Sequence, residues 1–173
     1  MCHIPTGTAE QRRGEAKRAC AESERSRNER TTHGTLIALI PDKEKRVWVY
    51  DGDGNLLWEQ PFTVIATAVA ISGDGQTVAV GARDANVDRY DRAGQLIWKQ
   101  QMKGVIRGLA INTDGSFLVA GDETRRAYGL AGEIPAGAKN STKWTVQTED
   151  KITSAATTAD GHVSVFGSRD KNA

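Results

Sequence analysis

The fold of this chain is decided by residues 67–106, which read TAVAISGDGQTVAVGARDANVDRYDRAGQLIWKQQMKGVI. Their pattern returns 40 residues later, where Asp114-Gly115 repeats Asp74-Gly75, and again after a further 46 residues at Asp160-Gly161. The same two shifts relate three glycines and three tryptophans: Gly81, Gly121 and Gly167, and Trp58, Trp98 and Trp144. An internal period of this length predicts an array of similar structural units, each of which buries its core against its neighbours.

Each complete unit is predicted to be a four-stranded antiparallel sheet. The quoted stretch contains four strand-length runs of β-branched, aromatic and small apolar residues, at 68–72, 77–82, 86–91 and 95–101. The connections between these runs, such as GDG at 73–75, are too short for a helix, so consecutive strands should pair as an antiparallel meander. The sequence therefore predicts an all-β fold.

The repeat divides the chain into a tail and four units. The tail covers residues 1–33, and the units are expected at 34–66, 67–106, 107–152 and 153–173. The third unit is longer than the second because it contains a Gly- and Pro-bearing segment at 130–141, which is predicted to be a loop. The strands of the third unit are expected at 108–112, 116–120, 124–128 and 142–147, and those of the fourth at 153–157 and 162–168.

Both ends of the array are predicted to be incomplete. Residues 27–32 read RNERTT where the second unit has the apolar TAVAIS, so the first unit is expected to lack its opening strand. The three remaining runs of the first unit lie at 35–40, 46–50 and 55–60. The fourth unit offers only two runs. These features predict a fragment of a larger repeat protein.

The tail at 1–33 differs in composition from the rest of the chain. It contains seven Lys or Arg and five Glu residues, no aromatic residue and few aliphatic ones. A segment with so little to bury is predicted to be disordered or a frayed charged helix, and its deletion is expected to leave stability nearly unchanged. Cys2, His3, Cys20 and His33 lack the paired spacing of a zinc site, so no metal is expected there.

The composition argues against several classes of protein. A net charge of +1 gives no electrostatic reason to expect binding to nucleic acid or to an anionic membrane. No apolar run approaches the ~20 residues that span a bilayer, and the N-terminus has no apolar leader segment. The only histidines are at positions 3, 33 and 162, and His162 follows a turn, so no catalytic Ser/His/Asp or Cys/His set is predicted.

Units of about 40 residues with four strands each resemble the blades of a β-propeller. VYDGDGNLLW at 49–58 and DRYDRAGQLIW at 88–98 are similar to pyrroloquinoline-quinone-like repeats, and VAISGDGQTVAVGARD at 69–84 is similar to WD repeats. Two departures accompany this resemblance. The quinoprotein docking motif contains a Thr that is missing here and is one residue longer than the stretches from Asp51 to Trp58 and from Asp91 to Trp98. The Gly-His pair of the WD type is also absent.

The resemblance implies a partial propeller of about three and a half blades, which is too few to close a ring. Propellers of these types act as docking platforms, assembly factors, ligand sensors and, rarely, quinone-dependent dehydrogenases. We therefore expect a non-enzymatic protein-interaction scaffold without a cofactor. The alternative is a ligand- or quinone-binding propeller domain of an enzyme or sensor. Exposed blade ends favour self-association. The sequence specifies no protein partner. Exported parents are common in this family, so the resemblance does not fix the cellular compartment.

The residues at repeated positions are interpreted as structural. Because Trp58, Trp98 and Trp144 share one repeat position, each is expected to pack against the next blade rather than stack on a planar ligand. In the three Asp-Gly pairs, Asp is expected to bond to its own backbone and Gly to supply a positive φ.

Two further motifs resemble a ligand site and a modification site. Asp51, Asp53 and Asn55 match the first ligand positions of a calcium loop, but Leu56 and Phe62 stand where Gly and Glu are required. A hairpin turn without metal is therefore expected. Asn140 begins a formal N-glycosylation sequon, Asn-Ser-Thr, in the predicted loop.

Overall fold

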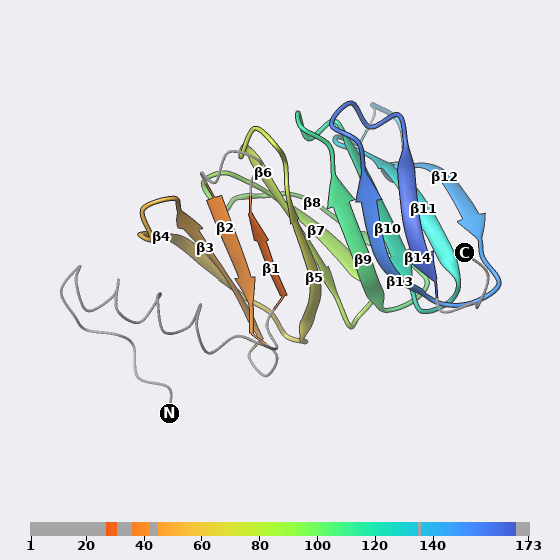
Figure 1. Cartoon of the computed structure of the whole chain (residues 1–173), viewed down its shortest axis with the longest axis horizontal. Helices are drawn as coiled ribbons and strands as arrows, with labels where there is room; N and C mark the ends of the chain where they lie inside the picture. The colour runs from red at the N-terminus through yellow and green to blue at the C-terminus, as the bar shows by residue number, and fades with distance from the viewer. Residues whose placement is uncertain (1–26, 31–35, 42–44, 135, 169–173) are drawn as a thin grey trace.

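The computed structural model describes residues 27–30, 36–41, 45–134 and 136–168. These residues form strands β1 to β14, arranged as three four-stranded sheets and one two-stranded sheet (Figure 1). Every sheet is an antiparallel meander in which consecutive strands are hydrogen-bonded, as the short connections predicted. The described residues contain no helix and therefore none that could cross a membrane. The predicted all-β propeller fold is confirmed.

The sheets are called blades 1 to 3 and the half-blade. Blade 1 contains β1 (Arg27–Arg30), β2 (Leu36–Ile40), β3 (Arg46–Asp51) and β4 (Leu56–Pro61). Blade 2 contains β5 (Ala66–Ile71), β6 (Thr77–Ala82), β7 (Asn86–Asp91) and β8 (Leu96–Gln101). Blade 3 contains β9 (Ile106–Ile111), β10 (Phe117–Asp122), β11 (Arg126–Ala131) and β12 (Thr142–Gln147). The half-blade contains β13 (Ile152–Thr157) and β14 (Ser164–Ser168).

The blades are stacked face to face in an open arc (Figure 1). Their first strands are neighbours, with β1 beside β5, β5 beside β9, and β9 beside β13, so these strands form the inner side of the arc. The fourth strands form the outer side. Three and a half blades arranged in this way make an incomplete ring, as the count of repeat units predicted.

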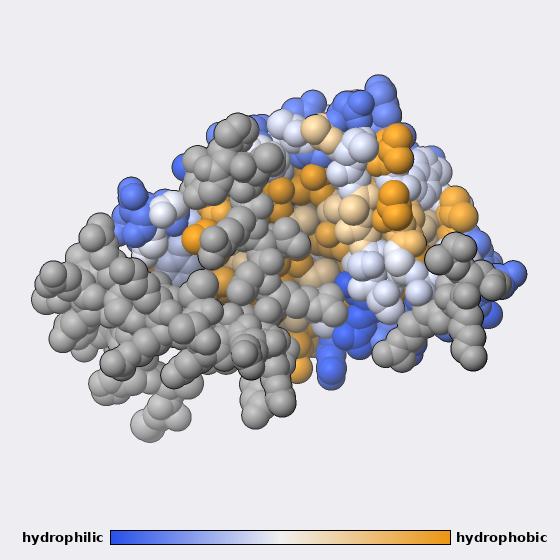
Figure 2. All heavy atoms as spheres, viewed as in Figure 1, coloured by the Kyte–Doolittle hydropathy of each residue, from blue (hydrophilic) through white to orange (hydrophobic). Residues whose placement is uncertain are grey.

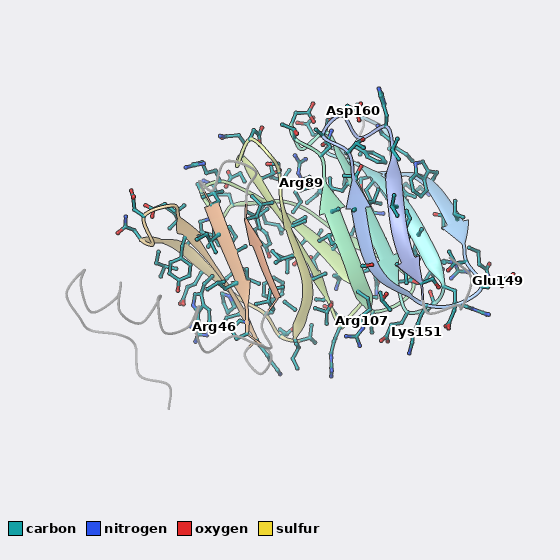
Figure 3. The ribbon with its side chains drawn as sticks, in the orientation of Figure 1. Arg46, Arg89, Arg107, Glu149, Lys151 and Asp160 are labelled. Atoms are coloured by element: carbon teal, nitrogen blue, oxygen red, sulfur yellow. The ribbon has the colours of Figure 1, made fainter. Side chains whose placement is uncertain are left out.

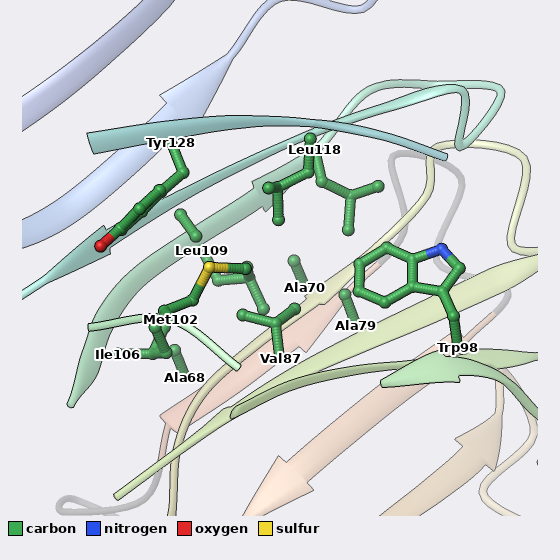
Figure 4. Packing of buried hydrophobic residues seen from close by; sticks show 12 residues of the cluster. Ala68, Ala70, Ala79, Val87, Trp98, Met102, Ile106, Leu109, Leu118 and Tyr128 are labelled. Atoms are coloured by element: carbon green, nitrogen blue, oxygen red, sulfur yellow. The ribbon is translucent and has the colours of Figure 1, made fainter. Parts of the chain in front are cut away.

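Hydrophobic cores fill the spaces between the blades. One core joins blades 1 and 2 and contains Leu36, Val49, Val69 and Tyr90. The other joins blades 2 and 3, with Trp98 at one end and Tyr128 at the other (Figure 4). The middle strands carry Ala, Val and Gly because both of their faces are covered, which explains why β6 is buried along its whole length.

Two glycines of the repeat make room for branched side chains of the next blade. A Cβ on Gly81 would lie only 2.4 Å from Cγ2 of Ile106, and one on Gly121 only 2.3 Å from Cγ2 of Ile152. Both isoleucines are fully buried. The glycine of one blade and the isoleucine that opens the next therefore form a repeated close contact.

One prediction about the first blade is wrong. The polar segment Arg27–Arg30, where no strand was expected, forms β1 and pairs with β2 in the register Arg27↔Ile40 to Arg30↔Ile37. Backbone hydrogen bonds do not require apolar side chains, so a strand can form where hydrophobic pattern gives no signal. The rest of the tail at 1–33 lies outside the described residues.

The other strand predictions differ only at the ends of elements. In blade 3, β10 and β11 extend two and three residues beyond the predicted ends, to Asp122 and Ala131. The inserted segment therefore begins at Gly132 rather than at Leu130.

Candidate interaction surface

Each repeated tryptophan lies next to a bulge. The third and fourth strands of every complete blade change register at one place, between Val49 and Tyr50, Arg89 and Tyr90, and Gly129 and Leu130. The residues paired with Trp58, Trp98 and Trp144 are Val49, Arg89 and Gly129, immediately before the bulge. A bulge bends the strand and can redirect a side chain, and it recurs beside all three tryptophans.

Trp58 and Trp98 bind the backbone that follows the third strand of the next blade. The indole Nε1 of Trp58 donates to the carbonyl of Arg92 at 3.1 Å. The Nε1 of Trp98 donates to the carbonyl of Gly132 at 2.8 Å. Both hydrogen bonds join residues 34 positions apart in the sequence, so they are the same contact repeated.

The indole rings also pack against that hairpin. A Cβ on Gly94 would lie 2.8 Å from the ring of Trp58. The centres of the Trp58 and Tyr90 rings are 5.7 Å apart. Trp98 is buried in the core between blades 2 and 3 together with Tyr128 and Leu130 (Figure 4). In both cases the indole contacts protein rather than an open ligand surface.

Trp144 occupies the same position in blade 3, but the sheet that follows blade 3 is the two-stranded half-blade. Its ring is half-buried and centred 6.3 Å from the rings of both Phe117 and Phe166. Among the described residues, no acceptor receives a hydrogen bond from its Nε1. A Cβ on Gly129 of the same blade would lie 2.2 Å from its Cε2, so the contacts of this indole differ from those of Trp58 and Trp98.

A groove opens beside Trp144, and we call it the terminal groove. Its volume is about 340 Å³, and Phe117, Val146, His162 and Phe166 are among the residues that line it. Hydrophobic side chains reach the surface over β13 and β14 (Figure 2). Val165 is 63% exposed, whereas Ala79 and Val119, which have the same place in the repeat, are fully buried. The half-blade thus shows the surface that complete blades cover.

The three Asp-Gly pairs lie in the turns between first and second strands. Asp74 Oδ1 accepts from the backbone of Gln76, Asp114 Oδ1 from that of Ser116, and Asp160 Oδ1 from that of His162. Gly75, Gly115 and Gly161 have φ values of 69°, 70° and 73°, in the left-handed region that favours glycine. Each pair thus has the same hydrogen bond and backbone conformation.

Hydrogen bonds hold two of these carboxylates in the ionised form. The pKa of Asp114 is lowered chiefly by the side chain and backbone of Ser116. The pKa of Asp160 is lowered chiefly by the hydroxyl of Thr158 and the backbone of His162. Both groups are therefore charged at neutral pH.

These turns and the turns between third and fourth strands lie on one edge of the blades, which we call the turn edge. It contains the short turns 51–55, 72–77, 91–95, 112–116 and 158–163 and the longer connection 132–141 between β11 and β12. The short turns contain six aspartates and one arginine, Arg92, and the connection adds Glu133 and Lys139. Figure 3 shows Asp160 on this edge and Arg46, Arg107 and Lys151 on the opposite edge. The turn edge is therefore acidic.

Two arginines bind the carbonyl groups of turn glycines. Arg92 Nη1 donates to Gly75 within blade 2 at 3.1 Å. Arg89 Nη2 donates to Gly115 across the boundary with blade 3 at 3.0 Å. Arg89 is buried, and this desolvation lowers its pKa. The turns are thereby tied to the body of the blades.

A glutamine that sequence reasoning missed joins blades 2 and 3. Gln100 Nε2 donates to Thr142 Oγ1 at 2.7 Å, and its Oε1 accepts the backbone N–H of Ser141 at 2.8 Å and the Ser141 hydroxyl. Gln100 and Ser141 are both buried. Nothing in the sequence distinguishes Gln100 from the exposed Gln101 beside it, except the alternation of β8.

A buried aspartate was also missed. Asp122 is fully buried and accepts hydrogen bonds from Thr124, from the backbone of Arg126 and from the hydroxyl of Tyr128 at 2.8 Å. Burial, together with Asp122, raises the pKa of Tyr128 to about 12. Asp122 could have been noticed as a turn residue before Thr124, but its repeat counterpart in blade 2 is Ala82.

The motifs that resemble calcium and glycosylation sites have ordinary local structure. Asp51 Oδ1 accepts the backbone N–H groups of Asp53 and Asn55, as in a hairpin turn. Asn140 is exposed, and its Oδ1 accepts the backbone N–H of Thr142. Among the described residues, no three His, Cys, Asp or Glu side chains gather as a metal site. The possible tail ligands Cys2, His3, Cys20 and His33 lie outside these residues.

Comparison with known proteins identifies the architecture. No protein-family model and no curated protein matches the chain. The structure is similar to that of the RRP9 WD40 repeats and to that of U3-55K, each with a TM-score of 0.65 and 18% sequence identity. In both comparisons 75% of this chain is covered, and it spans 41% of the other.

These similarities support the WD-repeat part of the resemblance and give no support to the quinone-like type. In all, 1316 chains of solved structures match, so the likeness identifies a widespread architecture rather than one task. The described part of this chain therefore has the fold of a partial WD40-type β-propeller.

Proposed function

We propose that this chain is a non-enzymatic docking segment of a larger β-propeller and that the turn edge binds partner proteins. The supporting observation is the regular spacing of aspartates on a rigid edge. Each turn is held between two paired strands, so the charges keep fixed separations. A partner with a basic segment would complement this pattern, whereas the phosphates of nucleic acid would be repelled.

The aspartates remain available to a partner although they stabilise their turns. Asp91 Oδ1 accepts the backbone N–H groups of Ala93 and Gln95 at 2.9 and 2.8 Å. Its Oδ2 receives no hydrogen bond from the described residues, and neither does that of Asp74. One oxygen therefore orders the turn while the other can accept a hydrogen bond from Lys or Arg.

Site-specific photo-crosslinking tests this proposal. A photoreactive amino acid is placed at Gln76 on the turn edge and, as the control, at Lys103 on the opposite edge; both positions are exposed. A partner captured from Gln76 and not from Lys103 is then purified, and its affinity for the chain is measured. Equal capture from both positions would contradict the proposal.

Charge-neutral variants give the second measurement. Asp74→Asn with Asp114→Asn keeps the turn hydrogen bonds and removes two charges, so it should weaken binding of the purified partner about tenfold at low salt. The matched control, Asp84→Asn with Glu149→Gln, removes two charges from the opposite edge and should have little effect. Similar losses in both variants would show that the turn edge is not the binding surface.

A further inference from the structure

We propose that two apolar pairs on the outer side of the arc, together with the acidic turns before them, bind a basic amphipathic helix of another protein. The pairs are Leu56-Leu57 on β4 and Leu96-Ile97 on β8, and we call them the outer pairs. This inference rests on the proposed docking function, because it extends the turn edge onto the outer strands and states which kind of segment binds there.

Each outer pair exposes two consecutive apolar side chains. Leu56 and Leu57 are 46% and 42% exposed, and Leu96 and Ile97 are 53% and 43% exposed. A regular strand would turn one residue of each pair towards the core. Leu57 and Ile97 are, however, the unpaired residues of the bulges in their strands, and a bulge interrupts the alternation.

This exposure does not depend on where the array ends. Blade 2, which carries Leu96 and Ile97, has blade 1 on one side and blade 3 on the other. Leu57 on blade 1 is no more exposed than Ile97, its counterpart in blade 2. Both pairs lie on fourth strands, at the outer side of the arc (Figure 1). A neighbouring blade therefore leaves such a pair open to solvent.

The fold does not need apolar residues at these positions. Blade 3 has the same bulge between its third and fourth strands, but Thr142 and Lys143 take the place of the apolar pair. Exposed apolar side chains add little to the stability of the chain alone and favour association with other molecules. Their presence in blades 1 and 2 therefore indicates a binding surface.

An acidic turn leads into each outer pair. Asp51 and Asp53 belong to the turn before Leu56, and Asp91 begins the turn before Leu96. The carboxylate of Asp53 and Oδ2 of Asp91 receive no hydrogen bond from the described residues, so both are available to a cationic side chain. Lys or Arg next to an apolar residue would therefore complement either place.

The two places belong to hairpins that contact each other. Trp58, the neighbour of Leu57, donates its indole N–H to the carbonyl of Arg92, and its ring lies against Gly94. Leu96 follows Gly94 in the same hairpin. A single segment that crosses the outer side of the arc can thus meet both outer pairs.

A helix fits these features better than an added strand. Strand addition needs a regular row of free backbone groups, and the bulges at Leu57 and Ile97 interrupt that row on both fourth strands. Binding then depends on side chains, as when an amphipathic helix lays its apolar face on exposed apolar groups. Flanking Lys or Arg residues on that helix supply the charge.

This chain itself is a poor source of the helix. A second copy would bring its own aspartates next to those of the first, and like charges oppose such a contact. Residues 1–26 contain basic side chains, but Met1 and Ile4 are their only large apolar ones. The occupant is therefore assigned to a different protein.

Titration with a designed peptide tests this assignment. The probe is an amphipathic Lys/Leu peptide of about 18 residues, or five helical turns, and the receptor is the full chain. Saturable binding should shift the methyl resonances of the outer pairs in a carbon–proton correlation spectrum. The methyl resonances of Val146 and Val163, which are equally exposed elsewhere, should stay unchanged. Equal shifts in both sets, or none at saturation, overturn the proposal.

Two variants separate the apolar from the charged contribution. Leu96→Ser with Ile97→Thr should weaken peptide binding about tenfold at any salt concentration, because it removes apolar area from the contact. Asp53→Asn with Asp91→Asn should weaken it severalfold at low salt and little at high salt, where the charges are screened.

A matched control makes the apolar result specific. Val146→Thr with Val163→Thr also replaces two exposed apolar residues and should leave binding unchanged. A peptide with Glu in place of Lys should bind at least about tenfold more weakly to the unaltered chain. A loss in the control equal to that of the outer-pair variant, or equal binding of the two peptides, contradicts the proposal.

Measurements without peptide give the remaining outcomes. The assignment is wrong if the methyl resonances of the outer pairs shift with protein concentration, on deletion of residues 1–26, or on addition of anionic phospholipid vesicles. These results would assign the surface to a second copy, to the tail or to a membrane, respectively. The readouts on β4 and β8 are independent of the crosslinks at Gln76. A failed titration with retained crosslinking would therefore reject the helix site and leave the docking function of the turn edge intact.

Discussion

Gln100 illustrates how a single side chain can hold two blades together. Its amide satisfies the Ser141 hydroxyl and backbone N–H and donates to Thr142. Gln100→Ala leaves these buried groups without partners, so the free energy of unfolding should fall by about 2 kcal/mol. Urea unfolding measures this change. Gln101→Ala, at an exposed position of the same strand, should change it by less than about 0.5 kcal/mol, and equal effects would contradict this role.

Tyr128 predicts a stability change at alkaline pH. Its pKa is raised to about 12 in the folded protein, whereas a tyrosine in an unfolded chain ionises near pH 10. A raised folded pKa stabilises the protein fully below pH 10, and this contribution is lost as the pH rises towards 12. The urea midpoint should therefore fall between pH 10 and 12, and fall less in Tyr128→Phe. Parallel curves for the two proteins would contradict the prediction.

Two equivalent turns allow us to measure how much the contact between a hairpin and the neighbouring blade contributes to the free energy of unfolding. Gly54 and Gly94 have the same φ of 83°, but a Cβ on Gly54 meets nothing within 4 Å, whereas one on Gly94 meets Trp58. Both alanine variants incur the left-handed strain of about 1 kcal/mol. Gly94→Ala should lose about 1–3 kcal/mol more, as measured by urea unfolding. Equal losses would show that the turn yields without disturbing the indole.

The sequence pattern predicted most of the strands because the same order of apolar runs and turns recurs in each repeat. The strands of blade 2 were placed to within two residues, since alternating apolar runs and Asp-Gly turns define both their ends. β1 was missed because its residues, RNER, carry no hydrophobic pattern. Its strand depends on pairing with β2, a tertiary effect that local sequence does not encode.

The candidate surfaces were predictable only in part. The Asp-Gly turns and the common role of the three tryptophans follow from equal spacing. The terminal groove does not, because it arises where Trp144 meets two strands instead of four. Gln100 and Asp122 were also hidden, since Ser141, a partner of Gln100, lies in the inserted loop and the equivalent turn of blade 2 has Ala82 in place of Asp122.

At the scale of the whole molecule, β1 changes the expectation for the N-terminal tail. Deletion of residues 1–33 removes a strand that pairs with β2 and lies beside β5, so it should lower the free energy of unfolding by about 2 kcal/mol or more. Deletion of residues 1–26 keeps β1 and is the matched control. Thermal and urea unfolding of both variants measure the difference, and identical stability would contradict a structural role for β1.

The contact between a glycine of one blade and an isoleucine of the next has an evolutionary consequence. Gly81 receives Ile106, and Gly121 receives Ile152, in the same manner. Blade 3 therefore carries both halves of a junction, Ile106 for the neighbour before it and Gly121 for the neighbour after it, whereas Pro41 and Ala66 stand at the equivalent positions between blades 1 and 2. Duplication of blade 3 by recombination would create a new junction that is already matched, so a gene built on this plan can gain a blade in a single step.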